Sequence, residues 1–556
     1  MPDKRSTGID KIVIRLYNLR KVAHIALFLL VSALPTEAQK YFVSFSDKNN
    51  NSYSIETPEY FLSQRAIDRR TKHDIQVLEQ DLPVTSLYVD SVKKMGIRVL
   101  WPSKWLNGVL VESSNQPLMD TITRVSFISD SKMVYQPTIG VAARKFVETK
   151  DVEPSDLKSS SVYGASWDQT QTLNGHYLHQ NNFEGQDIEI AVIDNGFDQV
   201  NTLPLFTHLW NDDRILTYRD FIKPGGNVFE SDSHGTKVLS VIGGYLNGEF
   251  KGSAPEAKFH LLRTEDNASE TPIEEYNWVV AAEYADSIGA DVINTSLGYY
   301  TFIGDYTDYT YQDMDGRTTI VVQGAETAFS KGMVVVCSAG NEGNNTWGKI
   351  ISPADGANVL SVAAMDSDSL RASFSSYGYS ADGRVKPDVA AIGLGTALQG
   401  TDGSIEFLNG TSFSAPVIAG FTACLWQAFP ELSNAEIIQL VKESCNNYSV
   451  PDNSFGYGIP DYKKAMDINN GIGNVSKNSI FTFPNPFNDQ LYISCSEGKV
   501  SADYLLIYDI AGNLVYEDVQ LKLPSSIDGL GKLPKGIYLL NIKVGRKVMV
   551  NKLVKK

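Results

Sequence analysis

Cysteine is scarce in this sequence, with four residues in a chain of 556. Disulfide frameworks belong mainly to small secreted domains that cannot build a large core, so four widely spaced cysteines do not predict one. Cys337 and Cys424 lie in apolar stretches, while Cys445 and Cys495 stand apart. We expect each to be a small core residue. A single bridge remains an open alternative, and the sequence does not select its partners.

Basic charge is also in short supply. The chain has 49 Lys and Arg against 65 Asp and Glu, which gives a formal net charge of −16. A phosphate backbone would be repelled unless a local basic patch overcame this charge, and the sequence has no cluster of Lys or Arg interleaved with aromatic residues. We therefore expect no nucleic acid partner.

Long hydrophobic runs are missing as well. The most apolar stretch, residues 23–34 (AHIALFLLVSAL), is about a dozen residues long and follows several basic residues. A helix that spans a bilayer needs ~20 such residues. Residues 1–38 are therefore predicted to be a signal peptide that is cut after Ala38, so that the protein is exported without a stable membrane span. A true start further along the chain, or an uncleaved anchor, is the alternative.

The length exceeds what one hydrophobic core supports, so several domains are expected. Residues 39–148 are predicted to form a small α+β domain. The polar residues 149–161 (TKDVEPSDLKSSS) are predicted to form a linker. Residues 162–470 alternate near-continuous apolar strands with helices, which predicts an α/β domain with a doubly wound, mostly parallel sheet covered on both faces. Residues 476–556 show short alternating strands and no helical period, which predicts a C-terminal β-sandwich.

Three residues of the α/β region have the chemistry of a nucleophilic site. Asp194 closes the predicted strand of AVIDNG, at the edge of a parallel sheet where such folds place their ligands. Of seven histidines, His234 lies in DSHGT, where a turn opens an apolar helix. Ser412 lies in NGTSFSAP, at the start of a helix whose N–H groups and dipole favour an anion. Taken singly, they also fit a turn aspartate, a structural histidine and a helix N-cap.

Together these segments resemble one family. AVIDNG, DSHGTKV and NGTSFSAP are similar to the three signature segments of the subtilisin-like serine proteases, in the order Asp, His, Ser. INTSLG (293–298) resembles the strand beside the specificity pocket of that family, and SAGNEG (338–343) resembles the loop that carries its oxyanion asparagine.

The resemblance implies roles for particular residues. Asp194, His234 and Ser412 would form the catalytic triad, and the Asn341 side chain would stabilise the oxyanion together with the Ser412 backbone N–H. No cofactor would be required for this chemistry. The substrate-binding residues would be Ser296, Leu297, Gly298, Ala339 and Gly340.

The sequence departs from the family in a few places. Lys237 stands where a second histidine is common, and Phe413 with Ser414 replaces a more usual Met-Ala. A tyrosine- and aspartate-rich insertion separates Gly298 from Asn341, and its residues 313–316 (DMDG) suggest a structural calcium ion. The EF-hand pattern around them is incomplete, and a solvated loop is the alternative.

The flanking domains acquire roles from the same resemblance. Residues 39–148 occupy the place of a propeptide, which implies a zymogen. The C-terminal domain, with PNP (484–486), GIY (536–538) and a basic end, resembles the type A sorting domain that directs cargo through the type IX secretion system of Bacteroidetes. The implied partners are protein or peptide substrates and the type IX machinery, and the implied location is secreted or cell-surface, reached through the periplasm. A catalytically lapsed adhesion protein on the same scaffold is the alternative.

Overall fold

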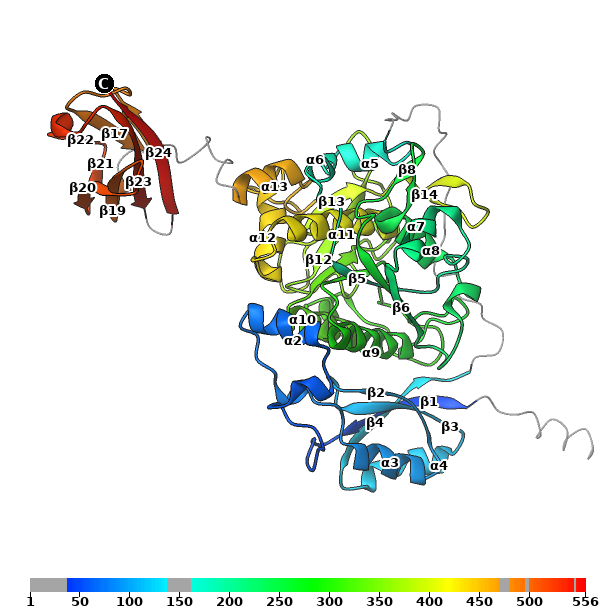
Figure 1. Ribbon diagram of the computed structural model, residues 1–556. Coiled ribbons are helices and arrows are strands. Elements are labelled where there is room, and N and C mark those ends of the chain that lie inside the picture. The colour runs from blue at the N-terminus through cyan, green and yellow to red at the C-terminus, as the bar shows by residue number, and fades with distance from the viewer. Residues whose placement is uncertain (1–37, 138–161, 470–479, 496–499, 545–546) are drawn as a thin grey trace, which may run out of the picture. The chain divides into compact units, whose positions relative to one another are not determined.

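The computed structural model describes residues 38–137, 162–469, 480–495, 500–544 and 547–556 (Figure 1). The chain forms two compact units that divide between Asp461 and Tyr462. The predicted signal peptide, apart from Ala38, and the predicted linker at 149–161 lie outside the described residues. Within the described residues, no helix combines the length and the apolar character needed to cross a bilayer.

The first unit begins with a small domain built on a four-stranded antiparallel sheet. Its strand order is β2-β3-β1-β4. The strands are β1 (Gln39–Phe45), β2 (Arg98–Ser103), β3 (Gly108–Ser113) and β4 (Ile128–Tyr135). The helices are α2 (Gln64–Lys72), α3 (Ser86–Lys94) and α4 (Gln116–Met119). These elements form the mixed α+β domain that the sequence predicts, although the sequence patterns did not identify strand β4.

Alternation along β1 sends its side chains to two faces of this sheet. Tyr41 and Val43 pack in one cluster with Val92 of α3. Phe42 lies on the opposite face, where it packs against Tyr276 of helix α9 (Ile273–Ile288), with ring centroids 4.7 Å apart. The small domain therefore has its own core and rests its second face on the larger domain.

The larger domain is organised around a seven-stranded parallel sheet with the order β13-β12-β11-β10-β5-β9-β6. Its strands are β5 (Glu189–Asp194), β6 (Ile215–Asp220), β9 (Lys258–Arg263), β10 (Val292–Thr295), β11 (Val334–Ser338), β12 (Leu360–Met365) and β13 (Val389–Ile392). Most of these strands are fully buried along their length, as expected for a sheet covered on both faces.

Helices cover both faces of this sheet (Figure 1). On one face lie α8 (His234–Gly243) and the long α11 (Thr411–Ala428), and on the other lie α9 and α10 (Ile320–Ser330). This confirms the predicted doubly wound α/β fold. Helix α9 begins directly after Pro272 and ends at Ile288, where the left-handed backbone of Gly289 (φ +98°) terminates it.

Shorter elements complete the larger domain. They are α5 (Trp167–Gln171), α6 (His176–Gln180), α7 (Thr207–Asn211), β7 (Tyr245–Leu246), β8 (Phe250–Lys251), β14 (Thr396–Gln399), β15 (Ile405–Leu408) and α12 (Asn434–Ser444). Cys337, Cys424 and Cys445 are buried, in keeping with their expected role as core residues.

The second unit, Tyr462–Lys556, is rich in strands, as predicted. A sheet of order β16-β17-β22 and a sheet of order β20-β19-β23-β24 enclose a core that includes Leu491, Leu505 and Leu540. Its elements are α13 (Tyr462–Asn469), β16 (Ile480–Phe483), β17 (Leu491–Cys495), β18 (Val500–Ser501), β19 (Tyr504–Asp509), β20 (Leu514–Val519), β21 (Lys522–Leu523), β22 (Ser525–Ile527), β23 (Gly536–Val544) and β24 (Lys547–Lys555).

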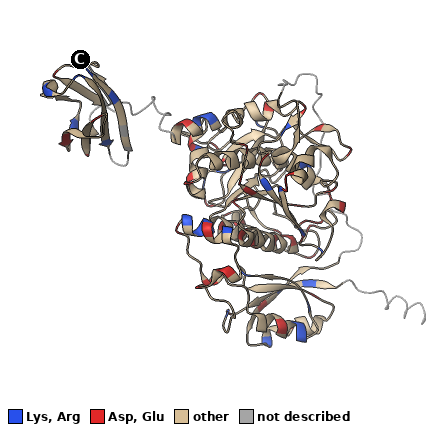
Figure 2. Cartoon of the chain, viewed as in Figure 1, with Lys and Arg blue, Asp and Glu red and all other residues tan. Residues whose placement is uncertain are grey.

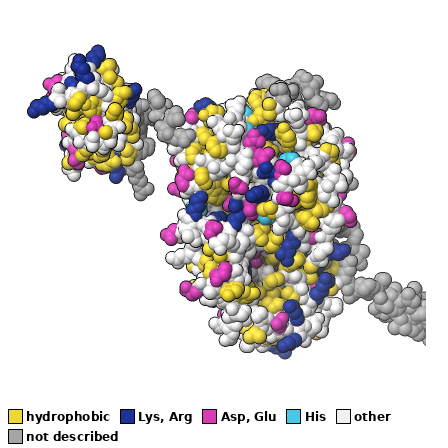
Figure 3. Space-filling view, viewed as in Figure 1, with side chains coloured by type: hydrophobic (Ala, Val, Ile, Leu, Met, Phe, Trp, Pro, Cys, Tyr) yellow, Lys and Arg dark blue, Asp and Glu magenta, His cyan; other side chains and the backbone are white. Residues whose placement is uncertain are grey.

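Charged residues of both signs occur together on the surface. Helix α2 carries basic and acidic residues (Figure 2), and the face drawn in Figure 3 intersperses the two signs with hydrophobic side chains. Exposed ion pairs contribute little to stability, because water screens them, whereas Arg69 and Arg70 of α2 are buried.

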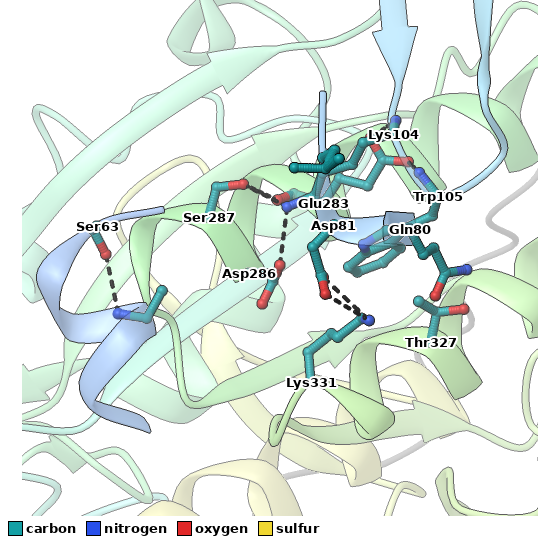
Figure 4. A network of polar contacts seen from close by, with 12 residues as sticks. Ser63, Gln80, Asp81, Lys104, Trp105, Glu283, Asp286, Ser287, Thr327 and Lys331 are labelled. Atoms are coloured by element: carbon teal, nitrogen blue, oxygen red, sulfur yellow. Dashed lines mark hydrogen bonds and ion pairs between the residues drawn. The ribbon is translucent and has the colours of Figure 1, made fainter. Parts of the chain in front are cut away.

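A buried ion network joins the small domain to α9. Asp286 accepts from Arg69 at 2.7 Å, from Arg70 at 2.9 Å and from Lys104 at 3.0 Å, and all four side chains are at least nine-tenths buried. Figure 4 shows the contact between Lys104 and Asp286. Burial alone would raise the pKa of Asp286, but Lys104, Arg70 and Arg69 more than offset it and hold that pKa below its usual range. The stabilisation is thus present above the pKa of an unfolded aspartate and is lost only as the pH falls through the lower, folded-state pKa.

A second carboxylate extends the network to α10. Asp81 of the small domain accepts from Arg70 at 3.2 Å and from Lys331, which follows α10, at 3.1 Å. Glu283 of α9 accepts from the hydroxyl of Ser103 at 2.5 Å and from the backbone of Lys104 at 2.9 Å. The contact between the two domains therefore depends on matched buried charges as well as on apolar packing.

We expect Asp286→Asn to lower the free energy of unfolding of the first unit by about 3–5 kcal/mol, because it leaves three buried cations facing a neutral side chain. Urea unfolding at neutral pH would measure this change in the free energy of unfolding. Both proteins would carry Ser412→Ala at the predicted nucleophile, so that the full chain stays uncut. The control is Asp90→Asn, whose partner Lys93 lies 3.5 Å away with both side chains 56% exposed. An equal effect of the two substitutions would contradict a special role for the network.

Candidate active site

The predicted triad residues come from three separate elements that meet at one edge of the parallel sheet. Asp194 is the last residue of the central strand β5, His234 is the first residue of α8, and Ser412 is the second residue of α11. The carboxyl ends of parallel strands share one edge of the sheet, and the order of the strands around β5 reverses there. The fold thus brings residues together that are more than 200 positions apart.

His234 and Asp194 are in direct contact. The Nδ1 atom of His234 lies 2.7 Å from Oδ1 of Asp194, and both side chains are almost fully buried. The same Oδ1 accepts from the backbone N–H of Asn195 at 2.8 Å. Because an ionised carboxylate only accepts, Nδ1 carries the proton of this bond, which fixes the tautomer of the imidazole.

Gly235 makes this contact possible. A Cβ atom at this position would lie 2.4 Å from the carbonyl oxygen of Gly196 and 2.9 Å from Cβ of Asp194. Any larger residue would push the start of α8 away from the end of β5. The glycine after the histidine therefore has a steric reason that the sequence alone does not reveal.

Ser412 lies at the N-terminus of an 18-residue helix and is 5% exposed. Its hydroxyl donates to the carbonyl oxygen of Ser296 at 3.4 Å, and the hydroxyl of Ser296 donates to the carbonyl oxygen of Ser412 at 2.8 Å. The ring of the next residue, Phe413, lies against the imidazole of His234, with centroids 5.7 Å apart. These contacts join Ser412 to the strand of INTSLG, and its neighbour Phe413 to the histidine.

Asn341 is oriented by a residue that the sequence analysis did not single out. Its Oδ1 accepts from the backbone N–H of Thr411 at 2.9 Å and from the hydroxyl of Thr411 at 3.0 Å. With the oxygen held, the NH₂ end of the amide is directed away from Thr411, and the Asn341 side chain is exposed. Gly340 adopts a left-handed backbone (φ +108°), which turns the chain out of β11.

A cavity of about 650 Å³ contains both Ser412 and Asn341. Four of the five predicted substrate-binding residues line it: Ser296, Leu297, Gly298 and Gly340. Ala339 is not in the lining. It is fully buried, and its backbone N–H pairs with Val362 of β12 at 2.9 Å, so its place is in the sheet.

A polar network begins at Asn195, the residue after Asp194. Asn195 donates to Asn267 at 3.0 Å, and Asn267 donates to Asp232 at 2.7 Å. Burial raises the pKa of Asp232, although the nearby Arg263 lowers it in part. Asp232 lies in the histidine motif, two residues before His234, and no sequence pattern indicated a role for Asn267.

The residues that suggested calcium make local hydrogen bonds. Asp315 accepts from the backbone N–H of Arg317 at 3.0 Å and of Thr318 at 2.9 Å, and Asp313 accepts from Thr310 at 2.7 Å. Among the residues that the structure describes, no group of three or more His, Cys, Asp or Glu is placed to hold a metal ion. Calcium at this position stays a prediction.

Comparison with known families adds a match for each part of the chain. Residues 185–458 match the subtilase family, peptidase S8. The central domain of this chain belongs to the subtilase family. Residues 40–150 match the peptidase S8 propeptide domain of Bacteroidota, and residues 482–556 match a secretion system C-terminal sorting domain.

Individual relatives are more distant. The thermophilic serine proteinase of Bacillus sp. (strain AK1) is 30% identical over 296 residues, which are 53% of this chain and 62% of the relative. Subtilisin NAT of Bacillus subtilis subsp. natto is 29% identical over 287 residues, which are 50% of this chain and 65% of the relative. The chain therefore spans less than two thirds of the length of either relative.

A solved structure is also similar. MycP1 from Mycobacterium smegmatis is 24% identical with a TM-score of 0.45, and the match covers 58% of this chain and 89% of MycP1.

Proposed function

We propose that this subtilase is a serine endopeptidase that hydrolyses peptide bonds through Asp194, His234 and Ser412. The observation that carries the proposal is the 2.7 Å contact between His234 and Asp194. The cavity lined by Ser412, at a helix N-terminus, supports it. The match of the central domain to peptidase S8 supports the same reaction.

The histidine is the proton carrier in this mechanism. A serine hydroxyl is almost never ionised at neutral pH, so His234 Nε2 takes its proton as Oγ of Ser412 attacks the substrate carbonyl. The proton then passes to the leaving amine as the C–N bond breaks and the acyl-enzyme forms. Water repeats the two steps and releases the acid. Asp194 stabilises the imidazolium through the Nδ1–H bond.

The negative charge that develops on the carbonyl oxygen requires donors already in position. The NH₂ of Asn341 and the backbone N–H of Ser412 serve as these donors, and the dipole of α11 adds to them. Thr411 is a positioning residue, because its two bonds to Oδ1 of Asn341 direct the NH₂ away from itself.

The flanking domains make this enzyme an exported zymogen. The propeptide match at residues 40–150 supports synthesis in a precursor form, and the sorting-domain match at 482–556 supports export by the type IX machinery to the medium or the cell surface. Passage through the periplasm is part of the proposal, as is cutting by the enzyme itself near residues 149–161.

We expect Ser412→Ala to abolish peptidase activity and to leave the chain uncut near residues 149–161. A fluorophosphonate probe should label the wild-type protein and not this variant. Ser414→Ala is the matched control, since that serine is buried two positions away and donates to Thr411 at 3.0 Å. Labelling that persists in Ser412→Ala would reject the triad, and a wild-type protein that takes no label would favour the catalytically lapsed adhesion protein.

Asn341→Leu should lower kcat by about 10² to 10³ with little change in KM. A single oxyanion donor is worth about 2.7–4 kcal/mol, a magnitude measured in an enzyme of this same family, and it contributes mainly once charge has developed. Active-site titration separates this role from a purely structural one. Full titratable sites with slow turnover support the donor, whereas lost sites with normal turnover per site would reject it.

Deletion of residues 476–556 should leave a folded enzyme that no longer reaches the medium, because the sorting domain would be missing while the first unit keeps its own core. Cell fractionation followed by fluorophosphonate labelling would show where the truncated enzyme is found. Normal appearance of the truncated protein outside the cell would reject the sorting role.

A further inference from the structure

The cavity that contains Ser412 is acidic. Three glutamates line it, Glu265, Glu270 and Glu342, and its described lining includes no lysine, arginine or histidine. They come from different segments: Glu265 and Glu270 follow strand β9, and Glu342 directly follows Asn341. The acidic lining therefore includes the direct neighbour of the proposed oxyanion residue and two residues from a separate segment.

Tyrosine hydroxyls hold two of these carboxylates in place, those of Glu265 and Glu342. Tyr299 donates to Glu265 through a short hydrogen bond, and Tyr300 donates to Glu342 at 2.9 Å. Burial, followed by the charges of Glu342 and Glu270, raises the pKa of Tyr300 to about 12, so its hydroxyl stays protonated at neutral pH. A neutral donor orients a carboxylate without cancelling its charge. The cavity thus keeps a negative potential, which a partly enclosed cleft strengthens.

We propose that this cavity selects substrates that place a lysine or arginine side chain in it. The inference rests on the proposed peptidase function and names the substrate class of that same site. A cationic side chain exchanges its water for carboxylates that are already oriented, whereas an acidic side chain would meet charges of its own sign. Glu270 and Glu342 are the specificity-determining residues of the proposal.

The chain itself contains a sequence with two adjacent basic residues, before the predicted linker at 149–161. Strand β4 of the small domain ends at Tyr135, and the backbone N–H of the next residue, Gln136, donates to the hydroxyl of Tyr306 at 2.5 Å. Tyr306 belongs to the same insertion as Tyr300, which lines the cavity. The chain therefore leaves the small domain beside the insertion that borders the cleft. Within the next ten residues the sequence carries Arg144 and Lys145 as neighbours.

The test compares the hydrolysis of two peptides by the mature wild-type enzyme, whose active sites are first titrated. One peptide is the sequence of residues 139–149 (IGVAARKFVET), and the other carries glutamine in place of both Arg144 and Lys145. We expect kcat/KM to be higher for the basic peptide by about tenfold at low salt. This ratio should shrink at about 1 M salt, where the Debye length is about 3 Å.

Variants of the cavity identify the cause of the preference. Glu342→Gln and Glu270→Gln should each lower the ratio of the two kcat/KM values by about threefold or more. The control is Glu431→Gln, which removes the same charge from an exposed residue outside the cavity lining and should leave the ratio unchanged.

The outcomes separate the two proposals. Equal kcat/KM for the two peptides, on an enzyme whose sites titrate fully, would overturn the substrate preference while the peptidase function stands. A preference that survives both glutamate substitutions would overturn the role of this cavity. An enzyme without titratable sites would overturn the peptidase function, and with it this inference.

Discussion

The contact between His234 and Asp194 is the constraint on which the rest of the site depends. It requires the start of α8 to approach the end of β5 so closely that a Cβ at position 235 would overlap the carbonyl oxygen of Gly196. Such an approach is possible only at the carboxyl edge of the sheet, where a strand ends and the following chain turns away. The buried β strands on either side of β5 keep that edge rigid, so the imidazole is held by the fold and not by a loop.

Sequence patterns predicted the elements more readily than their contacts. Apolar runs such as MVVVCSA located the parallel strands, because a sheet covered on both faces needs continuous apolar residues. Strand β4 was missed, since ISDSKMVY (128–135) carries only two buried positions, Ile128 and Val134. The role of Thr411 was also missed. It depends on a hydrogen bond between residues 70 positions apart, and no local pattern encodes such a bond.

The cavity shows the same limit from another direction. The family resemblance directed attention to residues 296–298 and 339–340, and the structure adds Glu265 and Glu270 to the same cavity from the segment after β9. Neither glutamate belongs to a motif. Conversely, Ala339 lies next to Gly340 in the sequence, yet it is fully buried directly after β11, and its N–H donates to Val362 of β12.

Two clusters of acidic residues in the described part of the catalytic domain have different partners. On α9, Asp286 and Glu283 are buried beneath the small domain, where Arg69, Arg70 and Lys104 neutralise the first and hydrogen bonds satisfy the second. Taking these charges out of water is favourable only because their partners come from the same precursor chain. In the cleft, Glu265 and Glu342 are instead oriented by neutral tyrosines, so their charge is left for a substrate to compensate. If the propeptide is released as proposed, the cations leave α9 while the glutamates of the cleft stay with the enzyme. The charges that hold the precursor together are thus separate from those that we propose select its substrates.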